Sequence, residues 1–341
     1  MKSRTRAAAI ATTAILSGAA FTGCAAFSDE AASSDDGVTR VTAGLYPLTW
    51  IAERVGGDAI EVTDLTPRGT DPHDLELTAK QTGDVADADL VILEKGMQAP
   101  LDQAAEQSAT GQVLDVTDAA RLVTADHQDE SEEEHAEHAD EHAEHADEHS
   151  EEEEHAEEGH EGHDHGSLGD LDPHFWQDPL RMADVADAVA EELAEVDPDN
   201  AETYRANAED VVADLEKLDE EFTTGLATCE RDTVVVSHNA FGYLTRYGLT
   251  FEPIAGLTPD AEPTPSDRAR LEELIRTEGI TTVFTERLAS SKIAGSLATD
   301  AGVETAVLDP LEGLTDETAD EDYLSLMRAN LSALQQANGC Q

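Results

Sequence analysis

Eight short apolar segments, arranged as two sets of four, constrain the fold of this chain more than any other feature. They cover residues 38–45, 59–65, 89–95 and 111–116 in the first half and 232–238, 249–255, 280–286 and 303–309 in the second. Each segment is rich in Val, Ile or Leu, and stretches with helical periodicity separate them. This alternation is typical of parallel sheets covered by helices. The sequence therefore predicts an α/β fold with two parallel-sheet lobes.

A long helical pattern separates the two sets. In residues 198–226 apolar side chains recur at steps of three and four, and after Pro198 no Pro or Gly occurs before Gly225. The pattern predicts one helix of about 26 residues, roughly 40 Å long. We therefore expect an N-terminal lobe at 38–197 and a C-terminal lobe at 227–341, joined rigidly by this helix. In a later helical stretch that starts at Pro265, Ser266 is the expected N-cap.

Residues 1–23 have the pattern of an export signal, with a basic start and then an apolar stretch. The small residue before Cys24 matches a lipoprotein signal peptide, whose cleavage leaves the Cys24 thiol free for acylation. Residues 24–37 would form a flexible tether. We expect a protein anchored by lipid on the extracytoplasmic face of the cell membrane. Cleavage by an ordinary signal peptidase is the alternative, and the protein would then be periplasmic or secreted.

Two further cysteines, Cys229 and Cys340, remain in the exported part of the chain. An even pair in an oxidising compartment favours a disulfide. The alternative is two buried thiols.

Residues 126–166 form an acidic, histidine-rich tract that interrupts the first lobe. It holds twenty acidic residues and ten of the thirteen histidines. Low hydrophobicity with high charge predicts disorder. Its histidines, an auxiliary metal-binding loop in our interpretation, are His127, His135, His138, His142, His145, His149, His155, His160, His163 and His165. They would collect or sense metal, or the tract is a solvated charged loop that binds metal incidentally. The net charge of −56 argues against nucleic acid and anionic membrane surfaces as partners.

The other three histidines occupy similar places in the chain. His73 and His174 each lie in the tripeptide Asp-Pro-His, and His238 ends the apolar segment at 232–238. Ligands of open α/β sheets bind beyond the carboxyl ends of the strands, so these three side chains can meet between the lobes. Imidazole nitrogens suit Zn²⁺, and three of them require a fourth ligand to complete a tetrahedron.

Four motifs carry a resemblance to a known family. They are GTDPHDLELTAKQTGDVADADLVI, LDPHFWQDP, VVSHNAFGYLTRYGL and VLDPLEGLT. With these motifs, residues 40–340 are similar to the zinc-binding solute receptors of ATP-binding-cassette (ABC) importers, the ZnuA-like or cluster A-I members of the TroA-like metal receptors. The resemblance implies that His73, His174 and His238 are zinc ligands and that Glu312 is the fourth. Asp309 is the main rival, and Glu286 or a water molecule are weaker ones.

The resemblance also implies a function. The protein would capture Zn²⁺ as cargo between its lobes and deliver it, as a monomer, to an ABC permease and its ATPase. Ordinary histidine pKa values imply that binding releases protons below about pH 6.5. Related manganese and iron receptors have a carboxylate where this chain has His238, so zinc is favoured over those metals. The alternatives are a manganese or iron receptor of the same family, a surface adhesin with a zinc site, and a zinc hydrolase. Against an enzyme, the chain has no HExxH motif.

Overall fold

The computed structural model describes residues 38–125, 168–259 and 263–341. The expected signal peptide and tether, with Cys24, lie outside the described residues, and so do the ten histidines of the acidic tract. In the described part of the chain, no helix combines the length and the apolar character needed to cross a membrane.

The first lobe holds a parallel sheet with the strand order β2-β1-β3-β4. Its strands are β1 (Thr39–Ala43), β2 (Ile60–Asp64), β3 (Leu90–Leu93) and β4 (Gln112–Asp115). Its helices are α1 (Tyr46–Gly56), α2 (Ala79–Asp87), α3 (Ala99–Ser108), α4 (Thr117–Ala120) and α6 (Pro179–Val196), with a short 3₁₀ helix η1 (Gly57–Ala59) before β2.

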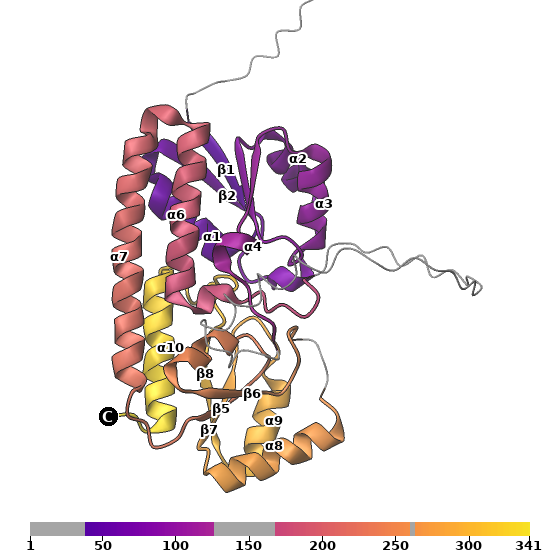
Figure 1. The fold of residues 1–341 in the computed structure, drawn as a ribbon. Coiled ribbons are helices and arrows are strands. Elements are labelled where there is room, and N and C mark those ends of the chain that lie inside the picture. The colour runs from indigo at the N-terminus through magenta and orange to yellow at the C-terminus, as the bar shows by residue number, and fades with distance from the viewer. Residues whose placement is uncertain (1–37, 126–167, 260–262) are drawn as a thin grey trace, which may run out of the picture. The chain divides into compact units, whose positions relative to one another are not determined.

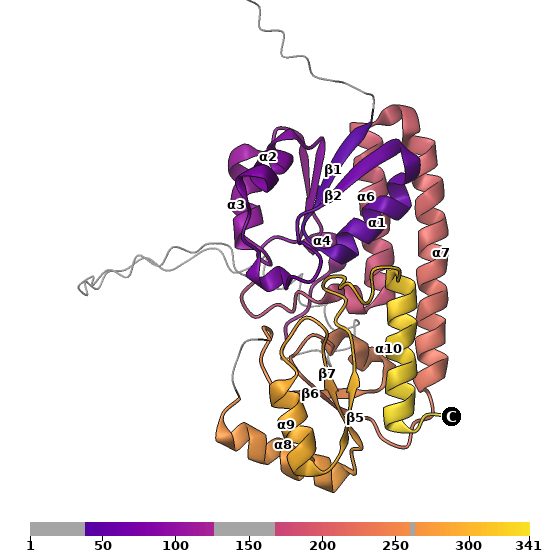
Figure 2. The same cartoon turned by 180° about the vertical axis from the view of Figure 1, so that it is seen from behind.

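Helices cover both faces of this sheet. Successive side chains of a strand point to opposite faces, and in β3 the side chains on both faces are buried. Leu90 and Ile92 belong to the core that includes α1 and α6, whereas Val91 and Leu93 pack with α2 and α3. Figure 2 shows α2 and α3 on the side of the sheet away from α1 and α6. Burial on both faces explains why this segment is continuously apolar in the sequence.

The second lobe repeats this design, with the strand order β6-β5-β7-β8. Its strands are β5 (Thr233–Val236), β6 (Thr250–Pro253), β7 (Thr282–Thr285) and β8 (Glu304–Val307). Its helices are α8 (Pro265–Glu278), α9 (Lys292–Ala301) and α10 (Tyr323–Asn338). All eight predicted strands are thus confirmed, each shorter than its apolar segment. In each sheet the first and third strands are neighbours whose connections lead to opposite sides, which opens a crevice at their carboxyl ends.

The predicted long helix is confirmed as α7 (Ala201–Leu226), which follows α6 through the 3₁₀ helix η4 (Pro198–Asn200). Its buried residues recur every three or four positions: Tyr204, Ala208, Val211, Leu215, Leu218, Phe222 and Leu226. The helix packs against α1 and α6 of the first lobe and α10 of the second (Figure 1). One core cluster contains residues of these helices and of both sheets. The lobes are therefore joined by continuous packing as well as by the chain.

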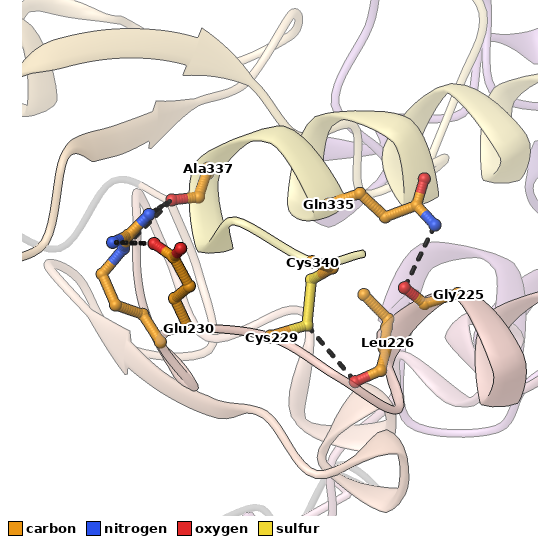
Figure 3. Close-up of a disulfide and its surroundings, with 8 residues drawn as sticks. Gly225, Leu226, Cys229, Glu230, Gln335, Ala337 and Cys340 are labelled. Atoms are coloured by element: carbon orange, nitrogen blue, oxygen red, sulfur yellow. Dashed lines mark hydrogen bonds and ion pairs between the residues drawn. A yellow bond between two sulfur atoms is a disulfide. The ribbon is translucent and has the colours of Figure 1, made fainter.

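The expected disulfide between Cys229 and Cys340 is present (Figure 3). It joins the chain just after α7 to the chain just after α10. Nearby, Gln335 Nε2 donates a hydrogen bond to the carbonyl of Gly225 at 3.1 Å. The C-terminal helix is thus bound to the end of α7 by a covalent bond and by a polar contact.

The predicted N-cap of α8 is wrong. The helix is capped by Thr264, whose hydroxyl accepts a hydrogen bond from the backbone N–H of Asp267. The Asp267 carboxylate in turn accepts from the backbone N–H of Thr264, completing a capping box. Pro265 explains the difference, because proline favours the first helical position and holds the preceding residue extended. Ser266 therefore lies inside the first turn.

Candidate metal centre

Four side chains from different elements meet at one point. His73 lies in the 3₁₀ helix η2 (Pro72–Asp74) after β2, and His174 directly precedes the 3₁₀ helix η3 (Phe175–Gln177). His238 follows β5 by two residues, and Glu312 follows β8 by five. One nitrogen or oxygen atom of each lies within 4.8 Å of the corresponding atoms of the others. The structure thus brings together the three predicted histidines and the carboxylate expected from its motif.

The geometry of this group suits a tetrahedral cation. Glu312 Oε1 lies 3.4 Å from Nε2 of His73, 3.2 Å from Nε2 of His174 and 3.4 Å from Nε2 of His238. Bonds of about 2.0–2.1 Å to a tetrahedral metal ion separate its ligand atoms by about 3.3 Å. These four atoms are buried and make no hydrogen bond within the described residues. Buried polar atoms are rarely left in this state, and a cation at their centre would satisfy all four.

The two Asp-Pro-His tripeptides form similar turns. Asp71 Oδ1 accepts a hydrogen bond from the backbone N–H of His73 at 2.9 Å, and Asp172 Oδ1 accepts from that of His174 at 3.0 Å. Asp172 Oδ1 also lies 2.7 Å from Nδ1 of the His174 ring. The sequence analysis did not assign a role to these aspartates. The repeated tripeptide was the signal that could have revealed it.

Glu286 holds the ring of His238 and lies outside the group of four. This residue follows β7 directly, and its Oε1 lies 2.7 Å from His238 Nδ1. A ring that donates its Nδ1–H to a carboxylate turns the lone pair of Nε2 toward the centre. Glu286, the weaker rival for the position of fourth ligand, therefore orients His238 instead of joining the group of four.

Asp309, the main rival, stabilises the loop that carries Glu312. Its Oδ1 accepts a hydrogen bond from the backbone N–H of Leu311 at 2.9 Å, and its Oδ2 accepts from Arg287 Nε at 3.0 Å. Within the described residues, Asp309 is not a member of the four-atom group.

The charges of the site raise the pKa of two of its imidazoles, those of His238 and His174. Burial lowers the pKa of His238, but a hydrogen bond with Glu286 and the nearby carboxylates of Glu286 and Glu312 outweigh it and raise the pKa to about 10. Burial likewise opposes a charge on His174, yet Asp172 and Glu312 raise its pKa. For Glu312, burial raises the pKa, whereas the three histidines lower it well below its usual value. An entering cation must displace protons, so proton release extends above the expected pH of about 6.5.

Comparisons with known proteins agree with this arrangement. Residues 41–337 match the family described as "ZnuA: Zinc-uptake complex component A periplasmic". The zinc-binding lipoprotein AdcA of Streptococcus pneumoniae is 32% identical over 308 residues, covering 88% of this chain and 56% of AdcA. The high-affinity zinc uptake system protein ZnuA of Bacillus subtilis is 33% identical over 298 residues, covering 86% of each.

Among solved structures, the Zn(II)-bound ZnuA-like domain of S. pneumoniae AdcA matches with a TM-score of 0.67 and 28% identity. That match covers 89% of this chain and 99% of the domain. This chain thus spans a little over half the length of AdcA itself. Because the family match extends over both lobes and all four residues of the candidate centre, the chain belongs to the ZnuA family.

Proposed function

We propose that this protein is a high-affinity extracytoplasmic receptor that captures Zn²⁺ with His73, His174, His238 and Glu312 and delivers it to an ABC importer. The main support for this proposal is that Glu312 Oε1 lies 3.2–3.4 Å from three buried imidazole nitrogens. The names of AdcA and B. subtilis ZnuA, which refer to zinc binding and zinc uptake, support this proposal.

The donor set favours zinc over harder cations and capture over catalysis. Three imidazole nitrogens and one carboxylate oxygen match the ligands and the coordination number that Zn²⁺ prefers, whereas Mn²⁺ favours more oxygen ligands. A catalytic zinc site keeps one position open for water, and four protein ligands would close it.

Ligands from both lobes would make the cation a bridge between them. We retain 38–197 and 227–341 as the lobes and 198–226 as the joining helix, because α6 ends at Val196 and α7 at Leu226. The continuous core around α7 opposes a wide hinge motion. Cargo would therefore enter and leave through rearrangement of the loops that carry the ligands. The loaded protein, a monomer held to the membrane through acylated Cys24, would dock on a permease driven by an ATPase.

The acidic tract is proposed as an auxiliary zinc collector or sensor beside this site. Its two ends leave the described structure close together, because Thr124 and Leu171 form an antiparallel bridge. The backbone N–H of Ala125 also donates a hydrogen bond to the carbonyl of Asp170 at 2.9 Å. A short turn can therefore replace residues 126–166 without displacing His174.

Zinc titration by calorimetry at pH 7.5 tests the proposal. The metal-stripped protein lacking residues 1–24 is compared with two variants, one lacking residues 126–166 and one carrying His238→Ala. We expect one tight site that survives removal of the tract and is lost or severely weakened in His238→Ala. A parallel titration with Mn²⁺ should give much weaker binding.

Two results would contradict the proposal. Tight binding that disappears with the tract but is unaffected by His238→Ala would place the functional site in the tract. Binding of Mn²⁺ as tight as that of Zn²⁺ would make the protein a receptor for a different metal.

A further inference from the structure

The carbonyl oxygen of Pro310, two residues before Glu312, accepts hydrogen bonds from two neighbouring side chains. Trp176 Nε1 donates to it at 2.7 Å and Gln177 Nε2 donates at 2.6 Å. Both side chains are fully buried. The donors lie two and three residues after His174 in the sequence. The segment with the second histidine thus holds the loop with the carboxylate, although about 130 residues separate them.

The loop held in this way has a strained backbone. Leu311 has a φ of 59° although it is not glycine, and its side chain is fully buried. The left-handed conformation is unfavourable for a non-glycine residue and persists only where its surroundings impose it. Those surroundings include Asn330, whose side chain bonds to both the N–H and the carbonyl of Asp309 at 2.9 and 2.6 Å. These two bonds fix the backbone of Asp309, two residues before Leu311.

The segment that carries the two donors, Trp176 and Gln177, is itself fixed. The hydroxyl of the fully buried Tyr323, in α10, donates to the carbonyl of Trp176 at 2.6 Å. The indole ring of Trp176 also lies edge-on to the His174 ring, with the ring centres 5.4 Å apart. The segment His174–Gln177 and the loop Asp309–Glu312 therefore form one connected unit.

We propose that Trp176 and Gln177 are positioning residues for Glu312. By holding the Pro310 carbonyl, they keep the carboxylate at tetrahedral distance from the three histidines before a cation arrives. His174 and Glu312 would then act as a preformed pair. This inference deepens the proposed function and rests on it. Loss of a residue that orients a metal ligand typically weakens metal affinity about 10–100-fold.

A double-mutant cycle separates positioning from mere core packing. Zinc affinity is measured for wild type, Gln177→Met, Glu312→Ala and the double variant; methionine keeps the length of glutamine but has no N–H donor. If Gln177 acts through Glu312, Gln177→Met should weaken binding about 10–100-fold in the wild type and less than about twofold in Glu312→Ala. Equal losses in both backgrounds would overturn the inference.

Two further variants complete the design. Gln335→Met removes the same kind of amide-to-carbonyl bond, to Gly225 near the disulfide, and should leave zinc affinity within about twofold of wild type. Trp176→Phe removes the other donor to the Pro310 carbonyl. If Gln177→Met does not fold, Trp176→Phe replaces it in the double-mutant cycle. The visible spectrum of bound Co²⁺ gives a second readout, because a displaced carboxylate changes the coordination geometry.

The outcomes also distinguish this inference from the proposed function. If His238→Ala binds zinc as tightly as wild type, the proposed site is wrong and the inference fails with it. If His238→Ala loses binding while Gln177→Met and Trp176→Phe both retain full affinity and an unchanged Co²⁺ spectrum, the receptor stands and the positioning role is wrong.

Discussion

At the scale of single residues, carboxyl groups have three different roles that depend on their position. Glu312 faces the Nε2 atoms of three imidazoles, whereas Asp172 and Glu286 each lie 2.7 Å from the Nδ1 atom of one imidazole. Glu94 is buried, and its two carboxyl oxygens have no hydrogen-bond partner within the described residues. These differences follow from which atoms surround each group.

The ion pair behind His238 should contribute to zinc affinity through its charge. Glu286→Gln keeps the shape and one acceptor atom but removes the negative charge that makes the imidazole a better ligand. We expect zinc affinity, measured by competition with a chelator, to fall at least about tenfold. Glu252→Gln in β6, which breaks a pair with Arg270 outside the site, is the matched control and should have little effect. Unchanged affinity in Glu286→Gln would show that the carboxylate only fills space.

Glu94 should make the protein less stable as the pH rises. Burial raises its pKa well above the usual 4.5, and the charges of Asp172, Asp115 and Asp102 add to this effect. Above about pH 4.5 the unfolded chain ionises this group while the folded protein keeps it protonated. Since the folded state then binds more protons, stability falls as the pH increases.

Glu94→Gln removes this penalty because its side chain is neutral at every pH. We expect Tm at pH 8 to exceed that of wild type by about 2–4 °C, the shift that about 1 kcal/mol produces in large domains. The difference should shrink as the pH falls toward 4.5, as calorimetry at several pH values would show. Glu106→Gln on α3, an exposed residue paired with Lys95, is the control. A difference in Tm that does not vary with pH would rule out titration of Glu94.

At the scale of elements, α7 and α10 are neighbours that the disulfide fastens at one end. The two cysteines are 111 residues apart in the sequence. Closing a loop of this length restricts the unfolded chain and stabilises the folded protein by about 4–5 kcal/mol. The same bond lies beside Gln335 and Gly225 rather than beside the metal centre.

Replacing both cysteines by serine should therefore lower stability without changing metal binding. We expect the free energy of unfolding in urea to fall by about 4 kcal/mol, with zinc affinity within about twofold of the disulfide-bonded protein. Reducing the wild type should reproduce this loss. A loss below about 1 kcal/mol would show that packing between α7 and α10 holds the ends together without the covalent bond.

At the scale of the whole molecule, the two lobes share one core and contribute jointly to the candidate metal centre. The main cluster of buried side chains includes β1 and β3 of the first sheet and β5 and β7 of the second. His73 comes from the first lobe, and His238 and Glu312 come from the second. Both features couple the lobes during unfolding.

We therefore expect a single unfolding transition that zinc shifts as a whole. Free zinc at about 1,000 times its dissociation constant should add about 4 kcal/mol of stability, seen as a higher Tm in calorimetry. Glu312→Ala should lose most of this gain at the same zinc concentration. Two separate transitions, of which zinc raises only one, would show that the lobes unfold independently.

The sequence alone determined the features that depend on local periodicity and on residue type. Short runs of Val, Ile and Leu indicate buried strands, and a repeat of 3.6 residues indicates a helix, so the eight strands and α7 were predictable. The three histidines were identified because they lie outside the tract, two in Asp-Pro-His tripeptides and one at the end of a predicted strand. Cys229 and Cys340 were paired because no other cysteine remained after Cys24.

Only the tertiary structure decided which groups face one another. Asp309, Glu286 and Glu312 all follow strands of the second lobe. The motif resemblance favoured Glu312, but residue type and periodicity left Asp309 and Glu286 as rivals, and only the structure shows which carboxylate reaches the imidazoles. The bonds from Trp176 and Gln177 to Pro310 join segments more than 130 residues apart, and the high pKa of His238 depends on two such distant groups. The physical reason is that periodicity acts over a few residues, whereas hydrogen bonds and charges act over a few ångströms, and packing alone brings distant residues within that range.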